Sequence, residues 1–159
     1  MNLNLSERRD MKLSTFLKSL IIVATMAVFA GCASVPMASK NQDAASKEFK
    51  APPPNKSGLY IYRNNFTGKS LKRTLTVDGV NIGATANRIY FHKEIPPGTH
   101  TLSTESEFGD NSLVFTAEGG KNYYFRQYIK MGVFVGGSGI ESVTEEEGQN
   151  AILECSEAK

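Results

Sequence analysis

Apolar and polar residues alternate in short stretches over residues 58–159. Residues 75–77 and 89–95 are clear examples, and in the second stretch Ile89, Phe91 and Ile95 share one face. Side chains of a β-strand point alternately to opposite faces, so this pattern predicts strands that are buried on one side. About seven such stretches, which begin with residues 59–62, predict one all-β domain.

Turn residues separate the predicted strands. Asp78-Gly79 is a hairpin dipeptide that joins residues 75–77 to a return strand at residues 81–83. Pro97-Gly98 combines a residue with a fixed φ and a residue that accepts positive φ, and it precedes a strand at residues 100–104. This succession favours an antiparallel β-sandwich, immunoglobulin-like or similar, and a closed barrel is the alternative.

The longest predicted strand covers residues 123–131, and its two faces differ in character. The odd positions are predicted to face the core, and they are Tyr123, Phe125, Ile129 and Met131. The even positions are Tyr124, Arg126, Tyr128 and Lys130. Tyrosine and arginine are enriched in binding hot spots, so the even face is our candidate binding surface. The alternative is an ordinary solvent-exposed face of a sheet.

The pattern changes to a helical period near the C-terminus. Thr144 and Glu147 have the spacing of a capping box, which predicts the start of a short helix. Ala151, Ile152 and Cys155 lie at spacings that can share one face of that helix. A last strand over residues 151–155 is the alternative.

The N-terminal residues have the pattern of an export signal. Lys12 and Lys18 precede an uncharged apolar run over residues 20–30. A helix of that length spans about 17 Å, which is too short for a bilayer core of about 30 Å. We therefore predict a signal peptide over residues 1–31, with Met11 as an alternative start.

The apolar run ends in Ala30-Gly31-Cys32, which resembles the lipobox of bacterial lipoproteins. The resemblance implies that residues 1–31 are removed and that Cys32 carries fatty acid such as palmitate, which places the protein in the bacterial cell envelope, on the periplasmic face of a membrane. The residue after Cys32 is Ala33 and not Asp, which favours the outer membrane over the inner membrane.

Residues 32–57 join the lipidation site to the predicted domain. Ala, Ser, Lys, Asn, Gln and Pro dominate this segment, and large apolar residues are few. Such a composition buries too little surface to offset the loss of chain entropy, so we expect a disordered tether.

The charge balance argues against nucleic acid as a partner. Residues 1–31 hold four of the 18 basic and two of the 16 acidic residues, so the remaining chain has 14 of each. It therefore lacks the basic surface of a nucleic-acid binder. The expected partners are the membrane, through Cys32, and an envelope protein or polymer.

The sequence contains no recognisable catalytic or metal-binding motif. His92 and His100 lie in different predicted strands and form no close-spaced metal motif, so we expect no metal and no cofactor. His100 is interpreted as a turn or cross-strand residue, and Gly136-Gly137-Ser138-Gly139 as a flexible loop. Cys155 has no intramolecular partner if Cys32 carries lipid, and we predict that it is buried.

Four short segments resemble successive landmarks of a family of small bacterial lipoproteins that is classed as a domain of unknown function. They are Leu59-Tyr60-Ile61-Tyr62-Arg63, Val77-Asp78-Gly79, Ile95-Pro96-Pro97-Gly98-Thr99-His100 and Gly120-Lys121-Asn122-Tyr123-Tyr124. Residues 77–102 are also similar to the hairpins of Pro-Glu-Gly-Ala surface repeats, which are β-sandwich-like. The resemblance implies a fold and supplies neither a reaction nor catalytic residues.

These observations favour a non-enzymatic envelope lipoprotein that acts as a binding or assembly module. An envelope hydrolase with an unrecognised site is the alternative, and a structural accessory without a ligand is a third hypothesis.

Overall fold

The computed structural model describes residues 35–106, 109–130, 132 and 136–159. The chain divides into two compact units, Met1–Cys32 and Ala33–Lys159, and the second contains every described residue. The predicted signal peptide, the alternative start at Met11, the lipidation site Cys32 and the core position Met131 lie outside the described residues. Among the described residues, no helix has the length and apolar character needed to cross a membrane.

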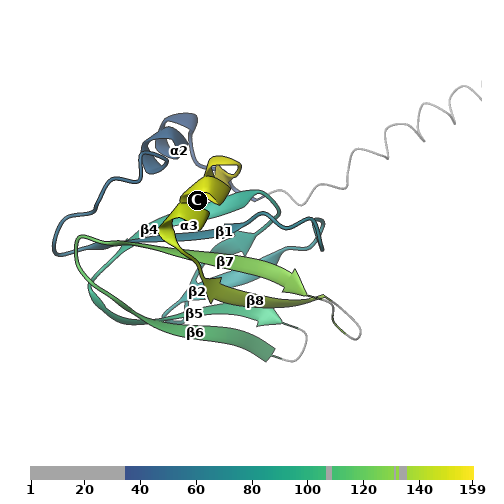
Figure 1. Cartoon of the computed structure of the whole chain (residues 1–159). Helices are drawn as coiled ribbons and strands as arrows, with labels where there is room; N and C mark the ends of the chain where they lie inside the picture. Colours follow the sequence, from purple (N-terminus) through teal and green to yellow (C-terminus); the bar gives the residue numbers. More distant parts are fainter. Residues whose placement is uncertain (1–34, 107–108, 131, 133–135) are drawn as a thin grey trace, which may run out of the picture. The chain divides into compact units, whose positions relative to one another are not determined.

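The described part of the chain forms two β-sheets and two short helices (Figure 1). The first sheet has the order β8-β7-β1-β4-β9, and the second has the order β3-β2-β5-β6. The strands of the first sheet are β1 Ser57–Arg63, β4 Ile89–Ile95, β7 Asn122–Lys130, β8 Gly137–Ser142 and β9 Ser156–Glu157. Those of the second are β2 Arg73–Val77, β3 Val80–Thr85, β5 Gly98–Ser106 and β6 Gly109–Ala117. The helices are α2 Lys40–Ser46 and α3 Glu145–Leu153.

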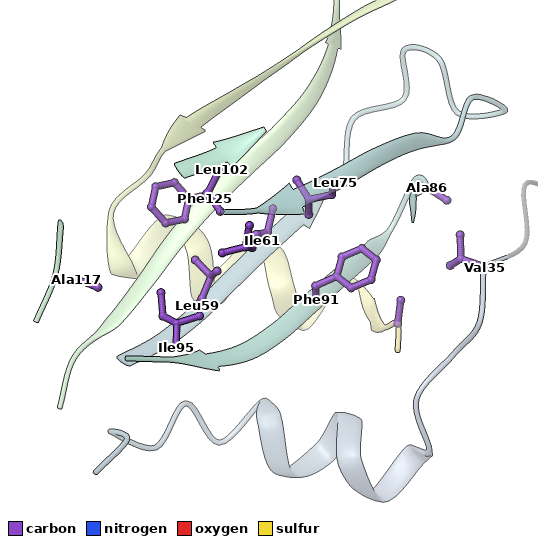
Figure 2. Packing of buried hydrophobic residues seen from close by; sticks show 12 residues of the cluster. Val35, Leu59, Ile61, Leu75, Ala86, Phe91, Ile95, Leu102, Ala117 and Phe125 are labelled. Carbon is purple, nitrogen blue, oxygen red and sulfur yellow. The ribbon is translucent and has the colours of Figure 1, made fainter. Parts of the chain in front are cut away.

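The main core lies between the two sheets, as Figure 2 shows. The inward side chains of the first sheet include Leu59, Ile61, Phe91 and Phe125, and those of the second include Leu75 and Leu102; all are at most 1% exposed. Burial of side chains of this size is the main favourable term in folding. The β-sandwich prediction is therefore confirmed, and the closed barrel is not formed.

The first sheet is mixed, whereas we predicted antiparallel pairing. β1 pairs antiparallel with β4 but parallel with β7, and β4 pairs parallel with β9. Sequence alternation reports which face of a strand is buried but not the direction of its neighbour. The second sheet is antiparallel throughout, and Asp78-Gly79 forms the predicted hairpin turn with positive φ at both residues.

The first sheet is buried on both faces because β1 carries large side chains at even positions as well as odd ones. Tyr60 and Tyr62 point away from the main core and pack with Tyr90, Tyr124 and Ile152 in a second cluster. Figure 1 shows α2 and α3 on this face, opposite the second sheet. The two helices therefore form a third layer over the sandwich.

The predicted C-terminal helix is confirmed, and the alternative of a strand over residues 151–155 is wrong. Thr144 is the N-cap of α3, and its side chain accepts a hydrogen bond from the backbone N–H of Glu147. Ile152 is buried in the second cluster, as the predicted helix face requires, whereas Cys155 is buried there from a position beyond the end of α3. The helix also presents Gly148 to Tyr124, at a distance that leaves no room for a side chain.

The predicted disordered tether is wrong for residues 35–56. Val35 packs in the main core beside Ala158, and the bridge between Met37 and Ala158 brings this segment alongside β9. Ser39 then caps α2 by accepting a hydrogen bond from the N–H of Gln42. The composition was misleading because this segment is held largely by polar contacts with distant residues, which an apolar count does not detect.

The predicted flexible loop at residues 136–139 is also wrong for its described strand residues. Gly137, Ser138 and Gly139 begin β8, which pairs antiparallel with β7. Gly139 lies opposite Tyr128, and a Cβ atom there would come within 2.7 Å of the tyrosine ring. The glycine therefore allows the close approach of an aromatic side chain across the two strands.

Candidate functional site

The predicted binding surface on the even face of β7 is only partly exposed. Tyr124 is 3% exposed, so its placement in a solvent-facing surface was wrong. Gly148 of α3 lies against its side chain, and Gln149 Nε2 donates a hydrogen bond to its hydroxyl over 3.2 Å. Burial raises the pKa of Tyr124. Tyr124 therefore belongs to the core beneath α3.

Arg126 joins three elements at the surface. Its Nε donates a hydrogen bond to Glu141 Oε1 over 2.6 Å, and Glu141 is its cross-strand neighbour on β8. Its Nη1 lies 3.8 Å from Glu147 Oε1 on α3. The side chain of Arg126 is 42% exposed, so solvent screens these pairs and they add little stability. Their main effect is to fix the orientation of the guanidinium group.

Tyr128 and Lys130 continue the exposed part of β7. The guanidinium carbon of Arg126 lies 5.9 Å from the centre of the Tyr128 ring, which is within cation–π range. Tyr128 is half-buried over Gly139, and Lys130 is exposed. We call Arg126, Tyr128, Lys130 and Glu141 the β7 surface.

Three aromatic rings cross the outer face of the first sheet beneath the helices. The ring of Tyr60 stacks on that of His92 with centroids 4.2 Å apart and on that of Tyr124 with centroids 5.2 Å apart. His92 and Tyr124 are the registered neighbours of Tyr60 on β4 and β7. Our sequence analysis missed this row, and the available signal was the pair Tyr60 and Tyr62 at even positions of a strand whose odd positions are already apolar.

The last residue of α2 is fixed to this aromatic row. Ser46 Oγ lies 3.1 Å from His92 Nδ1, and the hydroxyl of Tyr60 donates to the backbone oxygen of Ser46 over 2.9 Å. Burial lowers the pKa of His92 and so favours its neutral ring. The next residue, Lys47, donates from Nζ to the backbone oxygen of Cys155 over 2.6 Å.

Buried and half-buried carboxylates hold the other side of α2. Glu157 is 1% exposed, and its Oε1 accepts a hydrogen bond from Gln42 Nε2 over 2.8 Å. Asp43 Oδ1 accepts from the backbone N–H of Glu157, and Asp43 Oδ2 accepts from Lys47 Nζ, both over 2.9 Å. Burial acts against the charged form of Asp43, but these hydrogen bonds outweigh it and lower the pKa of Asp43. The helix is thus attached through charge-assisted hydrogen bonds.

His100 is a cross-strand residue at a turn, as predicted. Its Nδ1 lies 2.6 Å from Asp78 Oδ2 and its Nε2 lies 2.8 Å from the backbone oxygen of Pro96. Burial opposes the charged ring, but the hydrogen bonds to Asp78 and Pro96 raise the pKa of His100. Both ring nitrogens are used in these contacts. Within the described ranges, no three His, Cys, Asp or Glu side chains are grouped so as to hold a metal ion.

Cys155 is buried, as predicted, and is 3% exposed. Its Sγ lies 4.0 Å from the backbone oxygen of Arg63. Burial raises the pKa of the Cys155 thiol to about 12. The thiol therefore stays protonated at neutral pH, and protonated thiols are poor nucleophiles.

Arg63 is a fully buried residue whose role our sequence analysis did not foresee. Its Nη1 donates to the backbone oxygen of Leu71 over 2.9 Å, and its Nη2 donates to that of Gly68. Burial, with a smaller effect of nearby Arg73, lowers the pKa of Arg63 to about 10. These hydrogen bonds order the loop that follows β1, which is a structural role.

The family DUF2846, described as proteins of unknown function, matches residues 53–138. The chain belongs to the DUF2846 family. An uncharacterized protein of Haemophilus influenzae is 48% identical to it over 131 residues, which cover 82% of this chain and 78% of that relative. No solved structure matches the chain significantly.

Membership of this family confirms the predicted resemblance to a domain of unknown function. The matched range contains β1 to β7 and ends within β8, so it covers most of both sheets. The similarity to Pro-Glu-Gly-Ala repeats stays a prediction.

Proposed function

We propose that this DUF2846 protein is a lipid-anchored protein of the bacterial cell envelope whose β-sandwich binds another envelope protein or polymer without catalysing a reaction. One observation supports the anchor most strongly: the apolar run over residues 20–30 ends in the lipobox-like Ala30-Gly31-Cys32. The described fold begins at Val35, so the folded part of the chain follows this motif almost directly. The outer membrane is the proposed location.

The anchor is tested by metabolic labelling with a radioactive or clickable fatty acid. We expect Cys32→Ser to remove the label and to leave a longer, unprocessed precursor. Cys155→Ala is the matched control, because it removes the other cysteine of the chain and should keep both label and processing. Equal label in the wild type and in Cys32→Ser would contradict the proposed anchor.

The β7 surface is the proposed binding region. Arg126 and Tyr128 supply a fixed cation and an aromatic ring on neighbouring even positions of β7, and residues of these two types dominate known binding hot spots. Carboxylates on β8 and α3 hold the guanidinium in place, so a partner pays little ordering entropy at this side chain.

The binding region is tested by photocrosslinking in intact cells. A crosslinker at Tyr128 should capture a defined partner, and Arg126→Ala in the same chain should reduce that capture about fivefold or more, which corresponds to about 1 kcal/mol. A crosslinker at Val114, which is 66% exposed on β6, is the control. Identical products from both positions would contradict a binding role for this surface.

The hydrolase alternative has one contact in its favour, the hydrogen bond between Ser46 and His92. A serine hydroxyl beside an imidazole is the first element of a nucleophile–base pair. However, Ser46 is only 7% exposed, and the contact joins α2 to β4. We expect a fluorophosphonate probe to leave the protein unmodified; an adduct that Ser46→Ala abolishes would establish the hydrolase instead.

A further inference from the structure

The chain is attached to the sandwich from Val35 onward, close behind the proposed lipid anchor. Val35 is buried in the main core. The backbone oxygen of Pro36 accepts a hydrogen bond from the N–H of Lys159 over 3.0 Å, and the N–H of Ala38 donates to the backbone oxygen of Glu157 over 2.9 Å. This segment therefore lies alongside β9, at one edge of the first sheet.

The covalent chain leaves little distance between the anchor and the domain. Consecutive Cα atoms are about 3.8 Å apart, so the Cα atoms of Cys32 and Val35 can be separated by at most about 11 Å. A compact domain of this size has a radius of gyration of about 14 Å. A link shorter than this radius of gyration keeps the domain near the lipid headgroups.

Three basic residues belong to the segments that meet at β9. Lys40 is the first residue of α2, Lys159 is the last residue of the chain, and the backbone oxygen of Arg88 accepts a hydrogen bond from the N–H of Ser156 at the start of β9. All three are exposed, and none forms an ion pair with a described carboxylate. Met37, which is 40% exposed, forms a bridge with Ala158, the neighbour of Lys159 in the sequence. We call these four residues the anchor-proximal face.

The acidic groups near this face are largely neutralised by their own partners. Asp43 is paired with Lys47, and Glu157 is buried and accepts a hydrogen bond from Gln42. Glu154, which is exposed, and the terminal carboxylate of Lys159 remain. The three cations outnumber these two carboxylates by one. This positive excess beside an exposed methionine suits an anionic membrane surface, because basic side chains near such a surface are attracted to its headgroups.

We propose that the anchor-proximal face rests on the anionic lipid headgroups of the membrane that holds Cys32. This inference depends on the proposed lipidation of Cys32. This orientation also determines where the β7 surface lies, because β7 and β8 are at the opposite side of the five-stranded sheet from β9. Three strand spacings, or about 14 Å, separate β7 from β9, and four, or about 19 Å, separate β8 from β9. The β7 surface therefore faces away from the membrane and is open to partners in the periplasm.

The test uses the full lipidated chain in vesicles of phosphatidylethanolamine and phosphatidylglycerol that contain a lipid with a headgroup nitroxide. A fluorophore is attached at Asn41→Cys, an exposed position on α2 next to Lys40, or at Val114→Cys on β6 as the control. Buried Cys155 should not compete for the label, because its thiol is protonated. We expect quenching at Asn41→Cys to exceed that at Val114→Cys severalfold.

Charge reversal separates docking of this face from simple nearness to the anchor. The double change Lys40→Glu with Arg88→Glu, or replacement of phosphatidylglycerol by phosphatidylcholine, should remove most of the difference between the two positions. Equal quenching at both positions would overturn the inference. A difference in quenching that stays the same after charge reversal would also overturn it. Flotation of the protein with the vesicles tests the lipid anchor independently. A chain that does not float contradicts the proposed function. A chain that floats but shows equal quenching at the two positions contradicts only this inference.

Discussion

Phe125 and Tyr124 are neighbours on β7 and are buried on opposite faces of the sheet. Phe125→Ala should cost about 3–5 kcal/mol of unfolding free energy, because it leaves a cavity in the main core. Tyr124→Ala should also destabilise by several kcal/mol, about as much as other large aromatic deletions, because it empties the space beneath α3.

Denaturant titration measures both changes. Val114→Ala is the control, and a substitution at such an exposed position should change stability by less than about 0.5 kcal/mol. If Tyr124→Ala unfolds like the wild type, the outer face of β7 is solvated and the third layer of the fold is absent.

His100 and Asp78 should make stability depend on pH in a defined direction. The folded pKa of His100 is raised, so its contribution is fully present below the unfolded value of about 6.5 and is lost as the pH rises through the folded value. The pKa of Asp78 is lowered, first by the hydrogen bond with His100, so its contribution is lost in acid as the pH falls through the folded value. The pair therefore contributes most between about pH 4 and 6.5.

The measurement is the difference in melting temperature between the wild type and His100→Gln at each pH. The difference should be largest near pH 5 to 6 and should shrink toward pH 9. Because burial lowers the pKa of His92, its effect on stability has the opposite sign, and only the difference between the two proteins isolates the pair. A difference that grows with rising pH would show that His100 is neutral in the folded protein.

At the level of single residues, the sequence predicted the environment of residues whose burial follows from the alternating pattern or from a local turn. Phe125 in the core, Cys155 buried and His100 at a turn are confirmed. Tyr124 was assigned to the wrong environment because alternation separates the two faces of a strand but does not reveal whether a helix covers the second face.

Gly148 gives an element-level test of how α3 docks. Helix propensity alone favours alanine over glycine by about 1 kcal/mol. In this structure a Cβ atom at residue 148 would come within 2.5 Å of Tyr124 Cβ. Gly148→Ala should therefore lower stability, although it improves the intrinsic helix.

The matched control is Asn150→Ala, an exposed position two residues further along the same helix. This change should be neutral or slightly stabilising, as propensity predicts. Thermal melts of the two variants decide between the alternatives, since a stabilised Gly148→Ala would show that α3 does not pack tightly on β7.

Elements with a local pattern were predictable from the sequence, and elements held by distant partners were not. The strands of both sheets up to β7 follow from alternation and turn residues, and α3 follows from its capping box. By contrast, α2 is held by Glu157 and His92, which lie far along the chain. The glycine-rich start of β8 has no alternating side chains to reveal a strand.

For the whole molecule, the ordered segment from Val35 onward changes the expected relation between the proposed anchor and the domain. A disordered tether over residues 33–57 would let the domain stand away from the membrane. The structure instead attaches residues 35–56 to β9 and the aromatic row. With the proposed lipid on Cys32, the domain would therefore lie close to the membrane.

Amide hydrogen exchange on the intact protein tests this central claim most directly. The N–H groups of Ala38, Asp43 and Lys47 donate to the backbone oxygens of Glu157, Ser39 and Asp43. We predict slow exchange at these amides, comparable to that of other well-packed elements, and faster exchange in Asp43→Ala, which removes the contacts to Lys47 and β9. Glu48→Ala, at an exposed position just after α2, should leave the rates unchanged. Exchange across residues 36–49 at the rate of an unstructured peptide would contradict the account.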